Sequence, residues 1–237
     1  MKRVTFALAT GLLCGQALAA DLPMPAPPPR APAAYLPVAP IFTWTGFYIG
    51  ANGGYAFGNS TWTVTDPAIF AGQTTGSFQT KGWLAGGTIG GNYQTGAFVL
   101  GVEADLDWTN LKGNGSPTTC PTCQTSESWI STGRGRAGVA FDRLLVYGTG
   151  GAAYGNIKAS PAPGFTDTSN KWGWTAGGGV EYAFTPNITA KAEYLFVKFQ
   201  NGSCTAACVA GFPGGGPTAA NVTLNENIVR GGINYKF

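Results

Sequence analysis

The sequence predicts an all-β protein, an eight-stranded antiparallel up-and-down transmembrane β-barrel over residues 43–237. Three observations predict this fold class: apolar and polar residues alternate with period two, the connections between the alternating stretches are by turns short and long, and charged residues are only 11% of the chain. No stretch after the first 20 residues approaches 18 consecutive apolar residues, which excludes a helical membrane protein. So few charges also disfavour a typical soluble enzyme.

The N-terminal residues predict an exported protein. Lys2 and Arg3 precede a mostly apolar run that closes with small residues at positions 17–19, a pattern that predicts a cleaved signal peptide over residues 1–19. Its removal lowers the formal net charge from +3 to +1, so nothing indicates a nucleic-acid partner. Residues 20–42 are expected to form an extended periplasmic leader, because residues 21–41 contain eight prolines. This leader is a candidate contact for peptidoglycan.

Each stretch of alternation is expected to form one strand. The stretches lie, in chain order, near 44–57, 78–94, 97–108, 129–141, 144–155, 171–184, 188–199 and 224–237. Short connections are expected at 94–96, 142–143 and 185–187, and long ones at 58–77, 109–128, 156–170 and 200–223. Such strict alternation is typical of a membrane barrel with short periplasmic turns and long extracellular loops.

The polar face of the strands is expected to line the lumen. An arginine on the lipid face near mid-membrane costs about 2–4 kcal/mol, which turns Arg134 and Arg136 inward. Eight strands leave a lumen just wide enough for side chains, so opposite charges should pair there and plug it. A narrow ion-selective passage is the alternative. The expected lumen set is Glu103, Asp105, Arg134, Arg136, Glu181, Lys191, Glu193 and Arg230, with Glu226 as a further candidate.

The last strand carries a second pattern. Ile233, Tyr235 and Phe237 share the outward face, and Arg230 lies on the opposite face. A terminal Phe with apolar residues at alternate positions resembles the C-terminal signature of bacterial outer-membrane proteins. That resemblance implies recognition of Ile233, Tyr235 and Phe237 by the barrel-assembly machinery.

Two strand features concern orientation alone. Lys81 and Lys198 have the parity of the outward face near the predicted extracellular ends, where a lysine can reach the lipid headgroups. The expected contacts with outer-membrane lipid, lipopolysaccharide or outside partners lie instead in the long loops, which carry Trp62, Phe70, Phe165 and Phe212. The strand 144–155 carries no charge and allows two registers.

The cysteines lie in two predicted extracellular loops. Cys120 and Cys123 share one loop, and Cys204 and Cys208 share the other. Disulfides are favoured in an exported protein, and free thiols or a tetrathiolate zinc site are the alternatives. The pairing of the four cysteines cannot be read from their spacing.

No metal or other cofactor is expected. Without histidine there is no Ser-His-Asp arrangement, so an enzyme is not expected.

Three segments carry a resemblance to a known family. They are TWTGFYIGANGGYAFG at 43–58, RGRAGVAFDRLLVYGTGGAAYG at 134–155 and WTAGGGVEYAFTPNITAKAEYLFV at 174–197, followed by the final Phe237. The order of these segments resembles the small outer-membrane β-barrel family of alphaproteobacteria, known as outer-membrane immunogenic proteins or porin-family proteins. The resemblance covers residues 43–237 and implies an eight-stranded barrel in the Gram-negative outer membrane, with little indication of chemistry.

The expected function is therefore structural and surface-exposed, in the outer membrane. A diffusion porin for small solutes or ions is the alternative. A secreted soluble barrel that binds an apolar ligand ranks last, because it needs an apolar interior and a charged exterior, and the pattern here is the reverse.

Overall fold

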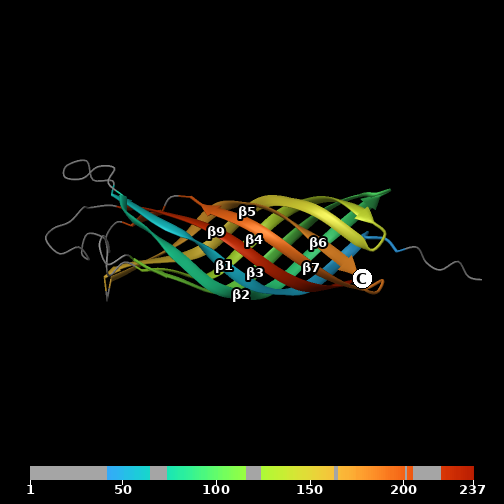
Figure 1. Cartoon of the computed structure of the whole chain (residues 1–237), viewed down its shortest axis with the longest axis horizontal. Coiled ribbons are helices and arrows are strands. Elements are labelled where there is room, and N and C mark those ends of the chain that lie inside the picture. The colour runs from blue at the N-terminus through green and yellow to red at the C-terminus, as the bar shows by residue number, and fades with distance from the viewer. Residues whose placement is uncertain (1–41, 65–73, 116–123, 163–164, 201, 205–219) are drawn as a thin grey trace, which may run out of the picture. The chain divides into compact units, whose positions relative to one another are not determined.

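The computed structural model describes residues 42–64, 74–115, 124–162, 165–200, 202–204 and 220–237. These residues form one closed antiparallel sheet, a long barrel whose strands are strongly tilted (Figure 1). The strands are β1 (Gly46–Val64), β2 (Thr74–Thr95), β3 (Phe98–Asn114), β4 (Gln124–Phe141), β5 (Leu144–Ala162), β6 (Phe165–Ala183), β7 (Ile188–Phe199), β8 (Gly202–Cys204) and β9 (Ala220–Lys236). No helix in the described part of the chain is long and apolar enough to span a bilayer.

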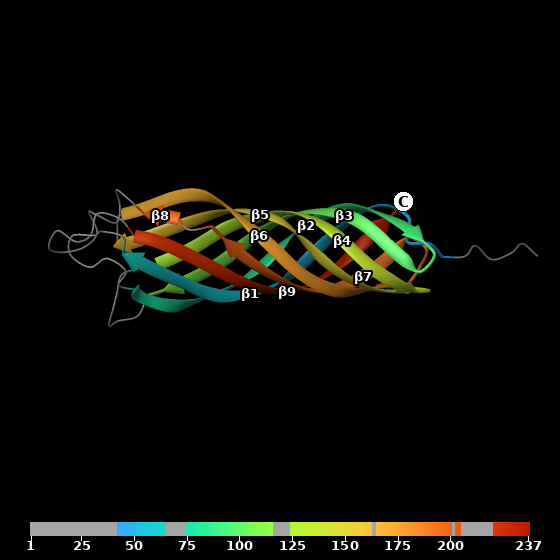
Figure 2. The same cartoon turned by 90° about the horizontal axis from the view of Figure 1, so that it is seen from above.

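Eight strands close the barrel, as the sequence predicted. Each strand from β1 to β6 pairs with its successor in the chain, β7 pairs with β9, and β9 pairs with β1. The closing register runs from Tyr48 opposite Lys236 to Val64 opposite Ala220. The three-residue strand β8 pairs only with the first residues of β9, Ala220 to Val222, at the end of the barrel away from the short turns (Figure 2).

The strands are longer than predicted at one end of the barrel. The expected long connection 156–170 is mostly strand, because β5 runs to Ala162 and β6 begins at Phe165. Apolar alternation reports where a strand meets lipid, whereas the hydrogen-bond ladder continues into water as long as a partner strand lies alongside. The sequence pattern therefore locates the membrane part of each strand and underestimates its length.

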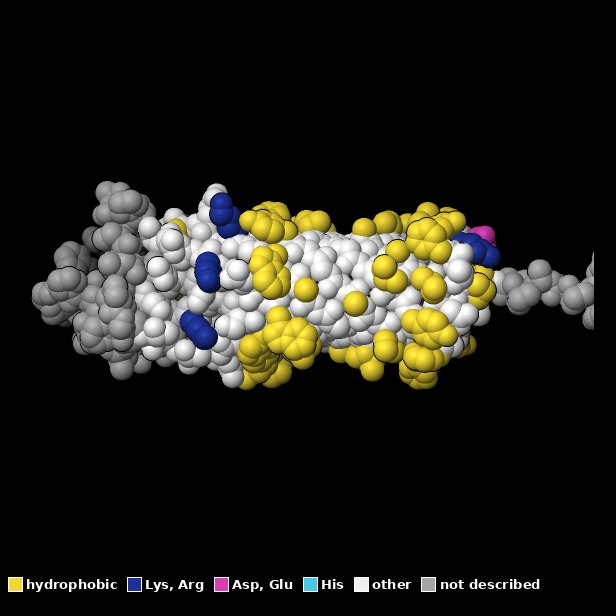
Figure 3. Space-filling model, turned by 90° about the horizontal axis from the view of Figure 1, so that it is seen from below, with side chains coloured by type: hydrophobic (Ala, Val, Ile, Leu, Met, Phe, Trp, Pro, Cys, Tyr) yellow, Lys and Arg dark blue, Asp and Glu magenta, His cyan; other side chains and the backbone are white. Residues whose placement is uncertain are grey.

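The outer surface carries two aromatic bands, one near each end of the membrane zone (Figure 3). Trp83, Trp108 and Trp172 are among the exposed residues of one band, and Phe98 and Phe141 belong to the other, beside the short turns. Aromatic girdles of this kind mark the two lipid-water interfaces of a membrane barrel. Since the short turns of such barrels are periplasmic, the band with Trp83 lies at the extracellular side.

The lumen is filled in three layers. An apolar cluster that includes Trp44, Val99 and Leu145 fills the periplasmic end. A charged layer occupies the middle, and a larger apolar cluster that includes Leu111 and Phe199 fills the extracellular half. Leu145 and Tyr147 both face inward, which decides the register of the strand that the sequence left open.

Trp44 closes the periplasmic base. Its indole Nε1 donates to the carbonyl oxygen of Asp142 at 3.1 Å, and its backbone N–H donates to Oε1 of Gln94 at 2.7 Å. The ring of Phe42 packs edge-on against it at 5.1 Å. The first residues of the predicted barrel therefore fold across its end before β1 begins.

Close approach of β1 and β9 generates a prediction about two adjacent glycines. A Cβ on the inward Gly54 would lie 2.2 Å from the carbonyl oxygen of Val229, whereas a Cβ on the outward Gly53 would find its nearest neighbour at 3.6 Å. We expect Gly54→Ala to lower the free energy of unfolding by about 1–3 kcal/mol through overpacking. Gly53→Ala should change it by less than about 0.5 kcal/mol. Urea unfolding in lipid vesicles measures both, and equal losses would contradict this account of the β1–β9 seam.

Candidate functional site

The candidate site is a cluster of charged side chains at the centre of the lumen. The structure brings together all eight residues of the expected lumen set, and each is at most 4% exposed. The set comes from five strands: Glu103 and Asp105 from β3, Arg134 and Arg136 from β4, Glu181 from β6, Lys191 and Glu193 from β7, and Arg230 from β9. In each of these strands, period-two alternation carries the charges to the inner face.

Arg134 lies at the middle of the cluster. Its guanidinium pairs with the carboxylates of Glu103, Asp105 at 2.6 Å and Glu193 at 2.8 Å. Lys191 reaches Glu103 from β7, with its Nζ 2.8 Å from Oε2. A desolvated guanidinium is stable only with such partners, so Arg134 depends on three carboxylates from two strands.

Arg230 joins the closing strand to the same carboxylates. It lies 2.7 Å from Glu193 and 3.1 Å from Asp105. Its Nη1 also donates to Oδ2 of Asp107 at 2.8 Å. Because Arg230 belongs to β9, this contact links the strand that closes the barrel to β3 on the far side of the lumen.

Arg136 forms a second centre toward the periplasm. It pairs with Glu181 at 2.6 Å and donates to the hydroxyl of Tyr48 at 2.9 Å. Its guanidinium carbon also lies 3.9 Å from the centroid of the Tyr147 ring, within range of a cation–π contact. The Tyr48 hydroxyl donates in turn to Glu103 at 2.7 Å, so the two centres are connected.

Neutral side chains complete the coordination of the carboxylates. Thr88 and Thr132 donate to the two oxygens of Asp105 at 2.7 and 2.9 Å. Thr189 and Asn234 donate to Oε1 of Glu181 at 2.5 and 2.9 Å. These donors hold Asp105 and Glu181 in one orientation, which makes the cluster a rigid part of the barrel.

Sequence reasoning missed three members of the cluster. Asp107 has the same inward parity as Glu103 and Asp105 but is not in the expected lumen set. Tyr48 also has inward parity, opposite the outward Phe47, and that signal could have found it. Tyr147 lies in the strand with no charges, where the sequence offered no signal for its orientation.

A separate pair of carboxyl groups lies in the extracellular apolar layer. Glu127 and Glu226 are 3% and 2% exposed and contact each other. Neither Glu127 oxygen meets a hydrogen-bond donor among the described groups, and neither glutamate takes part in an ion pair there. Two carboxylates cannot both be ionised at contact in an apolar layer, so we expect one of the two to be protonated. Glu226 therefore lines the lumen as expected but lies outside the charged cluster.

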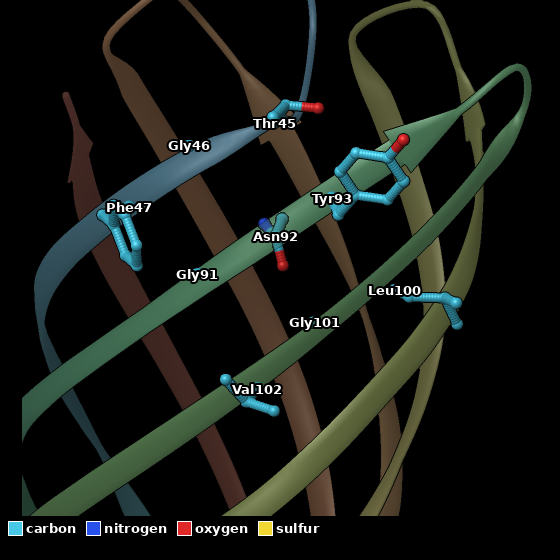
Figure 4. Close-up of a pocket in the computed structure, with 9 residues that line it drawn as sticks. All are labelled: Thr45, Gly46, Phe47, Gly91, Asn92, Tyr93, Leu100, Gly101 and Val102. Atoms are coloured by element: carbon cyan, nitrogen blue, oxygen red, sulfur yellow. The ribbon is translucent and has the colours of Figure 1, made fainter.

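Grooves on the outer wall lie among exposed apolar side chains. One groove is lined by Phe47, Gly91, Leu100, Val102 and their neighbours on β1 to β3 (Figure 4). The side chains of Phe47, Leu100 and Val102 are exposed, and lipid would cover them in a membrane. The groove is therefore a place where the outward Gly91 leaves room between larger lipid-facing residues.

The remaining predicted residues lie away from the lumen. Ile233, Tyr235 and Phe237 face outward and are 63%, 51% and 70% exposed, and the rings of Tyr235 and Phe237 meet at 5.3 Å. Lys81 and Lys198 also face outward.

The cysteine predictions concern mostly undescribed residues. Cys120, Cys123 and Cys208 lie outside the described residues, and Cys204 ends β8. Their disulfide bonds stay a prediction.

The two kinds of lumen glutamate should respond differently to the same substitution. Glu103→Gln removes a carboxylate from Arg134 and Lys191, and we expect it to lower the free energy of unfolding by about 3–5 kcal/mol. Glu226→Gln should change that free energy by less than about 1 kcal/mol. The new amide group can donate to Glu127 the hydrogen bond that a protonated Glu226 carboxyl group would donate. Urea unfolding of the refolded barrel in vesicles tests both variants. If Glu226→Gln lowered the free energy of unfolding as much as Glu103→Gln does, Glu226 would be ionised and paired with a buried cation.

Comparison with known proteins agrees with this architecture. A family model described as Outer membrane protein beta-barrel domain matches residues 31–237. The 31 kDa outer-membrane immunogenic protein of Brucella melitensis is 35% identical over 259 residues, and the alignment covers 100% of this chain and 100% of the relative. The 22 kDa outer membrane protein of Rhizobium leguminosarum is 34% identical over 70% of this chain and 69% of its own length.

A solved structure shows the same fold at low identity. The outer membrane protein OprG from Pseudomonas aeruginosa aligns with a TM-score of 0.50 and 14% identity, over 81% of this chain and 96% of OprG. The family match covers the whole barrel. The aromatic bands and the polar lumen are both features of a barrel that spans the outer membrane. The chain belongs to the outer-membrane β-barrel protein family, and its place is the bacterial outer membrane.

Proposed function

We propose that the protein is a structural, surface-exposed component of the outer membrane whose lumen is closed by paired charges. The observation that carries this proposal is the central cluster, in which Arg134, Arg136, Lys191 and Arg230 meet five carboxylates in the middle of the barrel. An eight-stranded barrel is only wide enough for its own side chains to fill the interior. A cluster of this size therefore leaves no continuous path for a hydrated ion.

The layers on either side of the cluster support a closed lumen. Trp44 and Leu145 belong to the periplasmic apolar cluster, and Leu111 and Phe199 to the extracellular one, all at most 1% exposed. An ion that crosses the barrel would need to shed its water in two apolar layers as well as break the central pairs. These costs add along the same path.

The names of the relatives support the surface-exposed part of the proposal. Two of the Brucella relatives are called outer-membrane immunogenic proteins, with masses of 31 and 25 kDa. Enzymatic activity is not part of the proposal, because the chain has no histidine and the charged cluster holds its carboxylates against cations that keep them from acid-base work.

A small-solute or ion porin is the second candidate. It is favoured by inward-facing, buried polar atoms that meet no donor or acceptor among the described groups, namely Asp107 Oδ1 in the charged layer and Thr80 Oγ1 in the extracellular half. Water in a continuous passage would satisfy such atoms.

Conductance in a planar lipid bilayer separates the two candidates. We expect no discrete current steps from the refolded wild-type barrel, whose folding is verified by heat-modifiable gel mobility. A larger outer-membrane porin in the same bilayer serves as the positive control.

The opposite result has a specific form. Discrete steps whose size or ion selectivity changes in Arg134→Ala would overturn the closed lumen and support the porin. Steps that do not change in this variant would place the conducting path outside the lumen cluster, which also contradicts the proposal.

A further inference from the structure

Three lysines lie side by side on the outer wall of the barrel. The strand register places Lys81 of β2 opposite Lys112 of β3, and Lys112 opposite Ser126 of β4. Ser126 in turn lies opposite Lys158 of β5. We call Lys81, Lys112 and Lys158 the lysine row. Since neighbouring strands are about 4.8 Å apart, the row spans about 14 Å across the strands at the level of the backbone.

The lysine row faces away from the lumen and has no acidic partner in the described part of the chain. Lys81 and Lys112 are exposed and Lys158 is half-buried, whereas their neighbours Leu111 and Ile157 are buried in the lumen. None of the ion pairs among described side chains includes a lysine of the row. Like charges directly opposite each other on neighbouring strands repel, so Lys81 and Lys112 favour an anion between them.

The position of the row in the membrane identifies the kind of anion. Trp83 lies two residues from Lys81 toward the middle of the barrel, and Trp108 lies four residues from Lys112 in the same direction. The aromatic layer continues onto the next strands, where the rings of Trp129 and Tyr154 are 5.7 Å apart. Because this aromatic band marks the extracellular interface, the lysine row lies at the headgroups of the outer leaflet. Figure 3 shows basic side chains along this side of the band.

We propose that the lysine row binds the phosphate groups of lipopolysaccharide, the phosphorylated and multiply acylated glycolipid of the outer leaflet. Its acyl chains would pack against the aromatic layer below the row. Several phosphates on one sugar headgroup match three ammonium groups spread over one arc better than a lipid with a single phosphate does. The proposal rests on the location in the outer membrane and not on the closed lumen, so its failure would leave the conductance result untouched.

The test measures binding of bisphosphorylated lipid A, the anchor of this glycolipid, to the refolded full chain in neutral detergent micelles. Tryptophan fluorescence reports binding, because Trp83 and Trp108 lie directly below the row. We expect the triple variant K81Q/K112Q/K158Q to weaken the affinity about 100-fold, from about fivefold for each lysine at an anionic headgroup. Lys198→Gln is the matched control, since Lys198 faces outward on β7, opposite Trp174 and Asn225 and beside no other lysine.

Each outcome bears on the proposal. A large loss in the triple variant, with wild-type affinity in Lys198→Gln and weak binding of dephosphorylated lipid A, supports it. Equal affinities of the triple variant and the wild type overturn it. Competition by millimolar inorganic phosphate, or equally tight binding of phosphatidylglycerol micelles, also overturns it in favour of a general anion site. Heat-modifiable mobility shows whether the triple variant folds, and the double variant K81Q/K112Q, with an expected loss of about 25-fold, replaces it if it does not.

Discussion

The pairing of β1 with β9 is the contact on which the rest of the structure depends. Lipid offers no hydrogen-bond partner to a strand edge, so a sheet in the bilayer must close on itself. Eight strands close into a narrow cylinder, and Gly54 lets β9 approach β1 at the seam, beside Arg230. Closure therefore fixes two further properties of the protein: an interior of limited width and an exterior that is apolar over the height of the membrane.

The narrow interior explains why the charged residues form one cluster. Arg134 and Arg230 cannot reach water from the middle of the barrel, so they pair with carboxylates of β3 and β7. The Arg134–Asp105 and Arg230–Glu193 pairs join neighbouring strands, whereas the Arg230–Asp105 pair crosses the lumen from β9 to β3. A shift of any strand by one residue would turn its charge toward lipid, and we infer that the cluster also keeps the strands in register.

The exterior follows a different physical rule at each height. Outward residues between the aromatic bands meet acyl chains, and the bands themselves lie where the acyl chains end. Above the extracellular band the same outward parity carries Lys81, Lys112 and Lys158 in place of apolar residues. A single strand cannot reveal this row, because its members are separated in the chain and meet only through the pairing of β2 to β5.

Period-two alternation, low charge and the positions of the short turns were sufficient to predict the fold class, the number of strands and the inward face of Arg134 and Glu103. These features were readable because each residue of a membrane strand meets either lipid or lumen, and its polarity reports which. Tertiary structure alone decided which charges meet, the inward position of Tyr147, the contact of Glu127 with Glu226 and the length of the strands beyond the membrane. The reason is that these properties depend on the stagger between strands and on contacts across the lumen, and no local pattern in the chain encodes either of them.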